Sequence, residues 1–273
     1  MSLHRLKPWL PSLGLVAAAA AAAQERPPRW ELGAVAVGVS QQAYPGADEQ
    51  VSRGLVLPYA IYRGDWLRAD RDGAGLRAFR TPRFELDLGV SGSFGGGSDA
   101  LQARRGLPRL GTLLEAGPRL QWRLGEALDG RWRAEFPLRV VLDASDGLRH
   151  RGAAFEPALV YDRESAGGWR TSTRLGFVAG DRKLADTFYG VPGTAATPTR
   201  PAYTARAGLI ATRLGVSTSV PLSEDWRLFG FARWQTVRGA ANEASPLVQQ
   251  RDGWSGGLGV SYTWMRSREA AAD

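Results

Sequence analysis

Apolar and polar residues alternate along several long stretches of this chain. The clearest stretch is 131–143, where Trp132 and Phe136 lie on one face and Arg133 and Glu135 lie on the other. A repeat of two residues is typical of a β-strand whose two faces meet different surroundings. The same alternation recurs at 83–90, 118–124 and 254–264.

The spacing of such stretches predicts about twelve strands. We place them at 29–39, 53–62, 66–71, 75–81, 83–93, 114–125, 131–143, 152–162, 168–181, 204–222, 226–238 and 253–264. Connections after even-numbered strands are short and those after odd-numbered strands are longer, except the short third connection at Asp72-Gly73. Outer-membrane barrels have this arrangement, with short periplasmic turns and longer outer loops. An even number of strands places both chain ends on the periplasmic side.

Tryptophan positions agree with this topology. They begin strands that run outward or lie near the ends of strands that run inward: Trp30, Trp66, Trp122, Trp132, Trp169, Trp226 and Trp264. All seven then lie at the periplasmic interface, where barrels carry an aromatic girdle. We therefore predict an all-β fold, a transmembrane antiparallel up-and-down β-barrel. A soluble exported β-sandwich or lipocalin-like barrel remains the alternative, because alternation alone does not distinguish lipid from a protein core.

Prolines interrupt the expected strands at four positions. These are Pro58, Pro118, Pro137 and Pro157. Proline has no backbone N–H to donate to a neighbouring strand. We therefore expect bulges at these positions.

The first residues have the composition of an export signal. Residues 1–23 contain a basic start, an apolar stretch and a run of alanines, which predicts a signal peptide cleaved after Ala23. The expected organisation is a signal peptide at 1–23, a barrel at 24–264 and a periplasmic tail at 265–273. The expected location is the outer membrane of a Gram-negative cell.

Composition limits the possible chemistry. The 273 residues include 34 Gly and 10 Trp but no Cys, which excludes a disulfide framework, a zinc–thiolate site and a Cys nucleophile. His150 is the only histidine outside the signal peptide, and no nucleophile motif accompanies it. The net charge of +8 comes from dispersed arginines rather than from a basic stripe, so a nucleic-acid partner is not expected. We expect no enzyme activity, cofactor or metal.

Short motifs along the mature chain resemble those of the MltA-interacting protein (MipA/OmpV) family of outer-membrane proteins. They are Tyr44-Pro45-Gly46, Leu57-Pro58-Tyr59, Tyr62-Arg63-Gly64-Asp65-Trp66, Arg71-Asp72-Gly73, Arg104-Arg105-Gly106-Leu107-Pro108, Glu115-Ala116-Gly117-Pro118, Pro137-Leu138-Arg139, Tyr189-Gly190-Val191, Arg200-Pro201-Ala202-Tyr203 and Ser245-Pro246-Leu247-Val248. The resemblance implies a non-catalytic scaffold that links a lytic transglycosylase and a peptidoglycan synthase to the membrane. We also expect a monomeric barrel surrounded by outer-membrane lipid.

Charged residues on the alternate strand faces are candidates for the barrel lumen. They are Arg83, Glu85, Asp87, Arg119, Arg123, Arg133, Glu135 and Arg139. One interpretation is a plug of cross-strand ion pairs. The other is a narrow, porin-like channel that prefers anions because arginine is in excess.

The loop 94–113 is a candidate constriction of that lumen, or a surface for adhesion outside the cell. It carries Arg104, Arg105 and Arg109. The sequence thus leaves three functions open. They are a periplasmic scaffold, a pore and an adhesin that acts through the outer loops.

Overall fold

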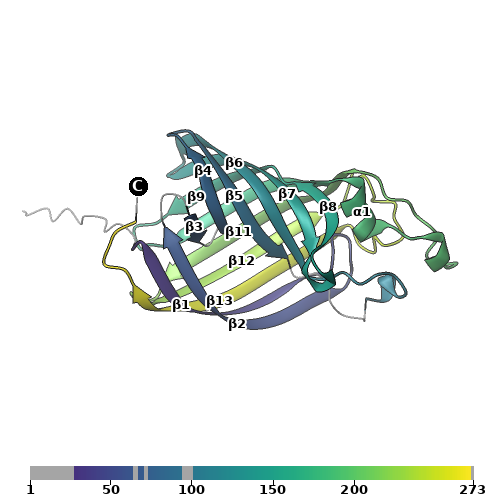
Figure 1. The fold of residues 1–273 in the computed structure, drawn as a ribbon, viewed down its shortest axis with the longest axis horizontal. Helices are drawn as coiled ribbons and strands as arrows, with labels where there is room; N and C mark the ends of the chain where they lie inside the picture. The colour runs from purple at the N-terminus through teal and green to yellow at the C-terminus, as the bar shows by residue number, and fades with distance from the viewer. Residues whose placement is uncertain (1–27, 64–66, 71–72, 94–100, 272–273) are drawn as a thin grey trace, which may run out of the picture.

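The computed structural model describes residues 28–63, 67–70, 73–93 and 101–271. The signal-peptide prediction for 1–23 lies outside these residues. Within them the chain forms one antiparallel sheet that closes on itself (Figure 1). No helix in these ranges is long and apolar enough to cross a membrane.

The strands and helices follow one another in a simple order. The strands are β1 (Trp30–Gln42), β2 (Gln50–Arg63), β3 (Leu67–Asp70), β4 (Gly73–Arg80), β5 (Phe84–Ser93), β6 (Leu113–Ala127), β7 (Gly130–Asp143), β8 (Arg149–Phe155), β9 (Ala158–Glu164), β10 (Arg170–Gly180), β11 (Gly208–Pro221), β12 (Trp226–Thr236) and β13 (Asp252–Arg266). The helices are α1 (Arg182–Tyr189) and the 3-10 helices η1 (Gln102–Arg104), η2 (Ala144–Asp146) and η3 (Gly193–Ala195).

Pairing of β13 with β1, and of β11 with both β10 and β12, closes the wall. The segments β8 and β9 are two halves of one strand, because β7 pairs with β8 at its outer end and with β9 at its other end. The break falls at Glu156-Pro157, where proline removes a donor from the ladder. The described segments therefore make twelve strands, and the predicted all-β antiparallel barrel is confirmed.

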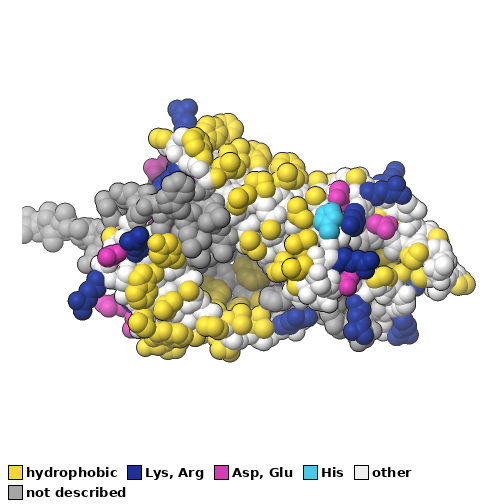
Figure 2. All heavy atoms as spheres, viewed as in Figure 1, with side chains coloured by type: hydrophobic (Ala, Val, Ile, Leu, Met, Phe, Trp, Pro, Cys, Tyr) yellow, Lys and Arg dark blue, Asp and Glu magenta, His cyan; other side chains and the backbone are white. Residues whose placement is uncertain are grey.

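Alternating side chains point to opposite sides of the wall. Leu88, Leu138 and Phe177 are exposed on its outside, whereas Glu85 and Glu135 are buried within it. Figure 2 shows hydrophobic side chains over the middle of the barrel and charged side chains toward its two ends. An apolar band between two polar ends is the surface that a bilayer requires.

The turns at one end of the barrel are tight. The connection between β6 and β7 is shorter than the sequence indicated, because only Leu128 and Asp129 separate the strands. Both residues have φ of 59°, as a type I′ hairpin turn requires. Tyr161 donates a hydrogen bond to the carbonyl of Leu128, which holds this unusual conformation of a leucine.

The longer connections at the other end pack together. We call residues 43–49, 101–112, 181–207 and 237–251 the outer cap; Figure 1 shows α1 beside these loops. Two hydrophobic clusters hold it. The first joins Leu184 of α1 to Val178 and Ile210 of the wall. The second joins residues from all four loops: Ala43, Tyr44, Ala47, Leu101, Leu110, Val191 and Leu247.

Helix α1 lies close to the wall because a glycine leaves room for it. Asp181 caps the helix by accepting a hydrogen bond of 2.8 Å from the Leu184 amide. Gly152 of β8 has φ of +128°, and a Cβ atom there would lie 2.5 Å from the Leu184 nitrogen. A larger residue at 152 would therefore push the helix off the wall.

Candidate functional site

Seven of the eight candidate lumen residues lie on adjacent strands of one part of the wall. Arg83 precedes β5 and is exposed, so it stands apart from the others. The remaining residues occupy β5, β6 and β7 in turn: Glu85, Asp87, Arg119, Arg123, Arg133, Glu135 and Arg139. The register brings Asp87 opposite Arg119 and Arg123 opposite Arg133. The inward-facing charged residues of the three strands therefore form one charged surface.

Carboxylates and guanidinium groups pair across this surface. Asp87 accepts bonds of 3.1 and 2.9 Å from Nε and Nη2 of Arg119, and Glu85 accepts one of 2.8 Å from Arg123. Such pairs give the buried carboxylates hydrogen-bond donors, which offset the free-energy cost of removing their charge from water.

Glu135 lies at the centre of the next group. It is 1% exposed and accepts a bond of 2.8 Å from Arg133 and another from Arg174 of β10. Arg133 also pairs with Asp162 of β9. Arg174 and Asp162 are not among the residues predicted from the sequence, because alternation is weak in the Ser- and Thr-rich strand β10 and because β9 is only half a strand.

A further charged group, also outside the sequence-based candidates, surrounds Arg139. Arg213 of β11 lies 3.6 Å from Glu156. Glu115 of β6 is within electrostatic reach of Glu156, Arg213 and Arg139, and Arg233 of β12 is within reach of Arg213 and both carboxylates. These residues come from distant parts of the chain, so only closure of the barrel brings them together.

The outer-loop candidates have different environments. Arg105 and Arg109 are exposed, whereas Arg104 is buried in the outer cap. Arg104 donates bonds of 2.8 Å to the Phe188 carbonyl and 3.2 Å to the Pro108 carbonyl. The described part of this loop therefore belongs to the cap.

Tyrosines and a serine link the remaining loops of the cap. Tyr44 donates a bond of 2.8 Å to the Leu247 carbonyl, and Tyr189 donates one of 3.1 Å to the Pro45 carbonyl. Ser245 donates one of 2.8 Å to the Tyr189 carbonyl. Burial raises the pKa of Tyr44 to about 12, although the Arg104 charge opposes this shift. Burial also raises the pKa of Tyr189 and lowers the pKa of Arg104 to about 10.

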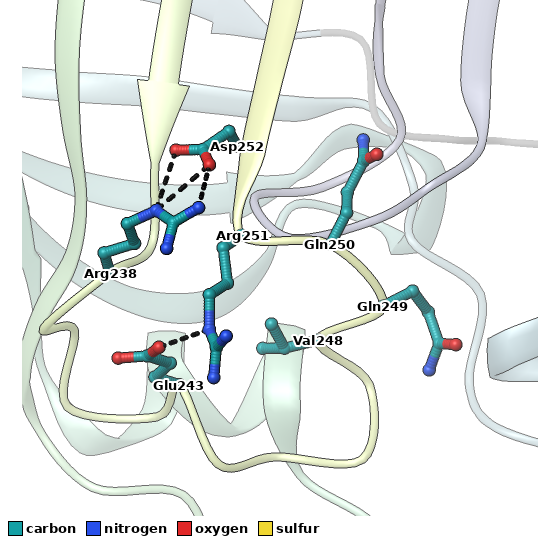
Figure 3. A pocket seen from close by; sticks show the side chains of 7 residues that line it. All are labelled: Arg238, Glu243, Val248, Gln249, Gln250, Arg251 and Asp252. Carbon is teal, nitrogen blue, oxygen red and sulfur yellow. Dashed lines mark hydrogen bonds and ion pairs between the residues drawn. The ribbon is translucent and has the colours of Figure 1, made fainter.

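A pocket of about 420 Å³ lies beside the loop that joins β12 to β13, and Figure 3 shows the side chains that line it. Arg238 binds Asp252 there through bonds of 2.6 and 3.0 Å, and Arg251 lies 2.6 Å from Glu243. The charges that line this pocket are already matched to one another. These ion pairs therefore hold the loop in place.

The opposite end of the barrel carries short turns and both ends of the described chain. We call residues 28–29, 81–83, 128–129, 163–169, 222–225 and 267–271 the periplasmic rim, after the side on which outer-membrane barrels carry their short turns. The Arg29 amide donates a bond of 2.8 Å to the Glu269 carbonyl, and Arg63 donates one of 2.7 Å to the Pro28 carbonyl. Met265 and Arg266 belong to β13, and Arg266 pairs with Asp225.

In the part of the chain that the structure describes, no group of three or more His, Cys, Asp or Glu residues could hold a metal ion. His150 lies on an exposed strand end, and its Nδ1 is 3.1 Å from the Lys183 ammonium. A neighbouring ammonium is not a nucleophile oriented for catalysis.

The family described as MltA-interacting protein MipA matches residues 32–264 of the chain. No curated protein resembles the chain closely enough to count as a match. Among solved structures, the NanC porin is similar with 9% identity over 84% of this chain and 98% of its own, at a TM-score of 0.43. The β domain of the Bordetella autotransporter BrkA has 12% identity, covers 86% and 99%, and has a TM-score of 0.40. An outer-membrane channel from Pseudomonas putida F1 has 15% identity, 89% and 98% coverage, and a TM-score of 0.39.

Proposed function

Because this chain belongs to the MltA-interacting protein MipA family, we propose that it is a non-catalytic scaffold of the outer membrane. The proposed partners are a lytic transglycosylase and a peptidoglycan synthase, which the barrel would hold beside the cell wall. Family membership is the observation that carries the proposal. The geometry of the two barrel ends supports it.

The periplasmic rim is the surface that such enzymes can reach. Its turns are too short to form a pocket, and a specific interface needs about 800 Å² on each partner. Several turns must therefore contribute together with the two tied chain ends. The pairs Arg29–Glu269 and Arg266–Asp225 hold those ends in place, so binding would not have to order them.

The outer cap supports the same function indirectly. Its loops use their hydrophobic side chains and many of their hydrogen-bonding groups on one another. Those side chains and hydrogen-bonding groups are therefore not available to a partner outside the cell. The rim is thus the better candidate for the interface.

The test is binding of a purified lytic transglycosylase to the full barrel in detergent. Charge reversal at three exposed rim positions, Arg163→Glu, Glu224→Arg and Arg268→Glu, changes the charge that the rim presents to a partner. Each single variant should weaken the Kd about fivefold or less, since exposed charge pairs contribute at most about 1 kcal/mol. The triple variant should weaken it about tenfold or more.

The matched control is Arg105→Glu, at an exposed position of the outer cap. It should leave binding unchanged. If the triple variant binds as the wild type does while the outer variant fails, the scaffold proposal is wrong and the adhesin alternative replaces it.

The charged lumen favours a narrow, anion-preferring pore as a second candidate. Planar-bilayer conductance tests it directly. A steady anion-selective current that Arg119→Gln reduces would support the pore, and a silent barrel that still binds the enzyme would leave the scaffold alone.

A further inference from the structure

One side of the lumen, away from the charged strands β5, β6 and β7, is apolar. Phe229 and Phe231 of β12 lie on the inner face, because a Cβ atom at Gly257 of β13 would lie 2.6 Å from the Phe231 ring and one at Gly259 would lie 2.5 Å from the Phe229 ring. The alternate residues of β13, such as Leu258, are exposed on the outside. The two rings therefore cover the glycines from within.

Strands β1 and β2 continue this apolar surface. Residues directly opposite one another on paired strands share a face. Gly259 pairs with Val37, which pairs with Leu55, and the same face carries Val35 and Leu57. Leu57 is 46% exposed although it points inward. We call Phe229, Phe231, Val35, Val37, Leu55 and Leu57 the apolar wall.

Arg233 adjoins the apolar wall and belongs to a group of three arginines that are incompletely paired. Arg139 is 8% exposed. Its Nη1 atom, together with the Nε atoms of Arg213 and Arg233, is buried without a hydrogen-bond partner. Arg233 follows Phe231 by two residues on the same face, so the charges and the rings are neighbours.

The charge balance of this group is positive. Arg139, Arg213 and Arg233 are accompanied by two carboxylates, Glu115 and Glu156. A buried guanidinium is stable when an anion pairs with it and accepts its hydrogen bonds. The group thus has the charge and the donors to bind one additional anionic group.

The apolar wall ends where β2 has only a short pairing with its next neighbour. β2 pairs with β3 only at Tyr62–Ala69 and Arg63–Arg68, and the described residues place no other strand beside Gln50–Ile61 on that side. β3 and β4 have 4 and 8 residues, fewer than the roughly 9–11 that cross a membrane. Pro58 lies in this stretch, as proline does on edge strands. Figure 2 shows the surface hollowed between β2 and the wall of β5.

We propose that the lumen binds an anionic amphiphile with a single long alkyl chain, such as a fatty acid. Its carboxylate binds Arg139, Arg213 and Arg233, and its chain lies along the apolar wall toward the edge of β2. A small soluble anion would leave the apolar wall in water, and a neutral lipid would leave the guanidinium donors unpaired. The site is separate from the periplasmic rim, so this proposal does not depend on the scaffold function.

The experiment uses the full barrel in a neutral detergent and a long-chain fatty acid with a photoreactive diazirine in its chain. After illumination, trypsin releases Gly54–Arg63 and Leu228–Arg233 as separate peptides, because arginine precedes and ends each of them. Fragmentation then locates the label at single residues. We expect saturable labelling at Leu55, Leu57, Phe229 and Phe231, which excess palmitate prevents and excess phosphate or hexadecanol does not.

Variants test the carboxylate site. Arg139→Gln with Arg233→Gln should reduce saturable labelling about tenfold, the size expected for losing charge-assisted contacts, and Arg233→Lys should retain most of it. Arg123→Gln removes a lumen arginine that is paired with Glu85 instead, and labelling should persist. Heat-modifiable electrophoretic mobility checks that each variant is assembled.

The result that overturns the proposal is equally specific. Two results with the wild-type barrel exclude the site, and neither depends on whether a variant assembles. In the first, hexadecanol prevents labelling as well as palmitate does. In the second, labelling occurs only at outward residues such as Val56 and Leu228. Unchanged labelling in an assembled Arg139→Gln, Arg233→Gln double variant also excludes it. Transglycosylase binding, measured on the same variants, is expected to be unaffected.

Discussion

The Arg104 guanidinium lies over the Tyr44 ring, with its central carbon 5.5 Å from the ring centre. The two residues belong to different loops and meet inside the outer cap. This cation–π contact lets a buried positive charge face an aromatic surface instead of water. Both residues also donate hydrogen bonds to carbonyls of other loops, so the pair joins four segments of the cap.

Replacement of Arg104 should loosen the cap. Arg104→Ala removes two charge-assisted bonds to buried carbonyls, which should cost about 1–3 kcal/mol of local stability. We expect faster proteolysis of the outer loops in intact outer-membrane vesicles. Arg105→Ala alters the exposed neighbour and should have no effect; equal proteolysis of the two variants would contradict the role assigned to Arg104.

Tyr44 should ionise near pH 12 rather than near pH 10. Because its pKa is raised in the folded protein, its contribution to stability is complete below pH 10 and is lost as the pH rises through 12. The lowered pKa of Arg104 acts in the opposite sense, since the penalty for its buried charge is relieved above pH 10. The measurement is therefore tyrosinate absorbance, compared between the wild type and Tyr44→Phe. A difference that titrates near pH 10 would show that Tyr44 is not buried.

Removal of the carboxylate at Glu135 should destabilise the barrel wall. Glu135→Ala leaves Arg133 and Arg174 facing one another without their shared partner, at a cost of about 3 kcal/mol. Arg174→Met removes one half-exposed partner and should cost about 1 kcal/mol or less. Urea unfolding in lipid vesicles measures both, and a larger loss for Arg174→Met would reverse our assignment of Glu135 as the centre of the group.

The orientation of β7 is testable with neighbouring residues. Leu138 is 52% exposed on the outside, so Leu138→Arg places a charge in lipid and should cost about 2–4 kcal/mol. Arg139→Leu changes the inner face and should leave assembly largely intact. The folded fraction of each variant, measured by heat-modifiable mobility, should follow that order, and the reverse order would mean that the assigned faces are exchanged.

The strands and their faces could be predicted because both depend on local pattern. Residues 131–143 alternate between lipid and lumen one by one, and the predicted β7 differs from the observed strand by a single residue at its start. Alternating loop lengths likewise predicted the topology. The apolar half of the lumen escaped prediction because β1 and β2 carry apolar residues on both faces, at 34–39 and 55–61. This loss of alternation is the signal that could have revealed it.

On strands that alternate clearly, such as β7, the sequence determined which residues point outward, since a bilayer on one side and a polar lumen on the other impose a two-residue repeat. Only the tertiary structure decided what the scattered motifs do. Tyr44, Arg104, Tyr189 and Ser245 come from four loops, yet their side chains bond to one another's segments in the outer cap. Arg139, Arg213 and Arg233 likewise gather only after the barrel closes. Contacts between residues so distant in the chain depend on the register and closure of the whole wall, and no local repeat encodes them.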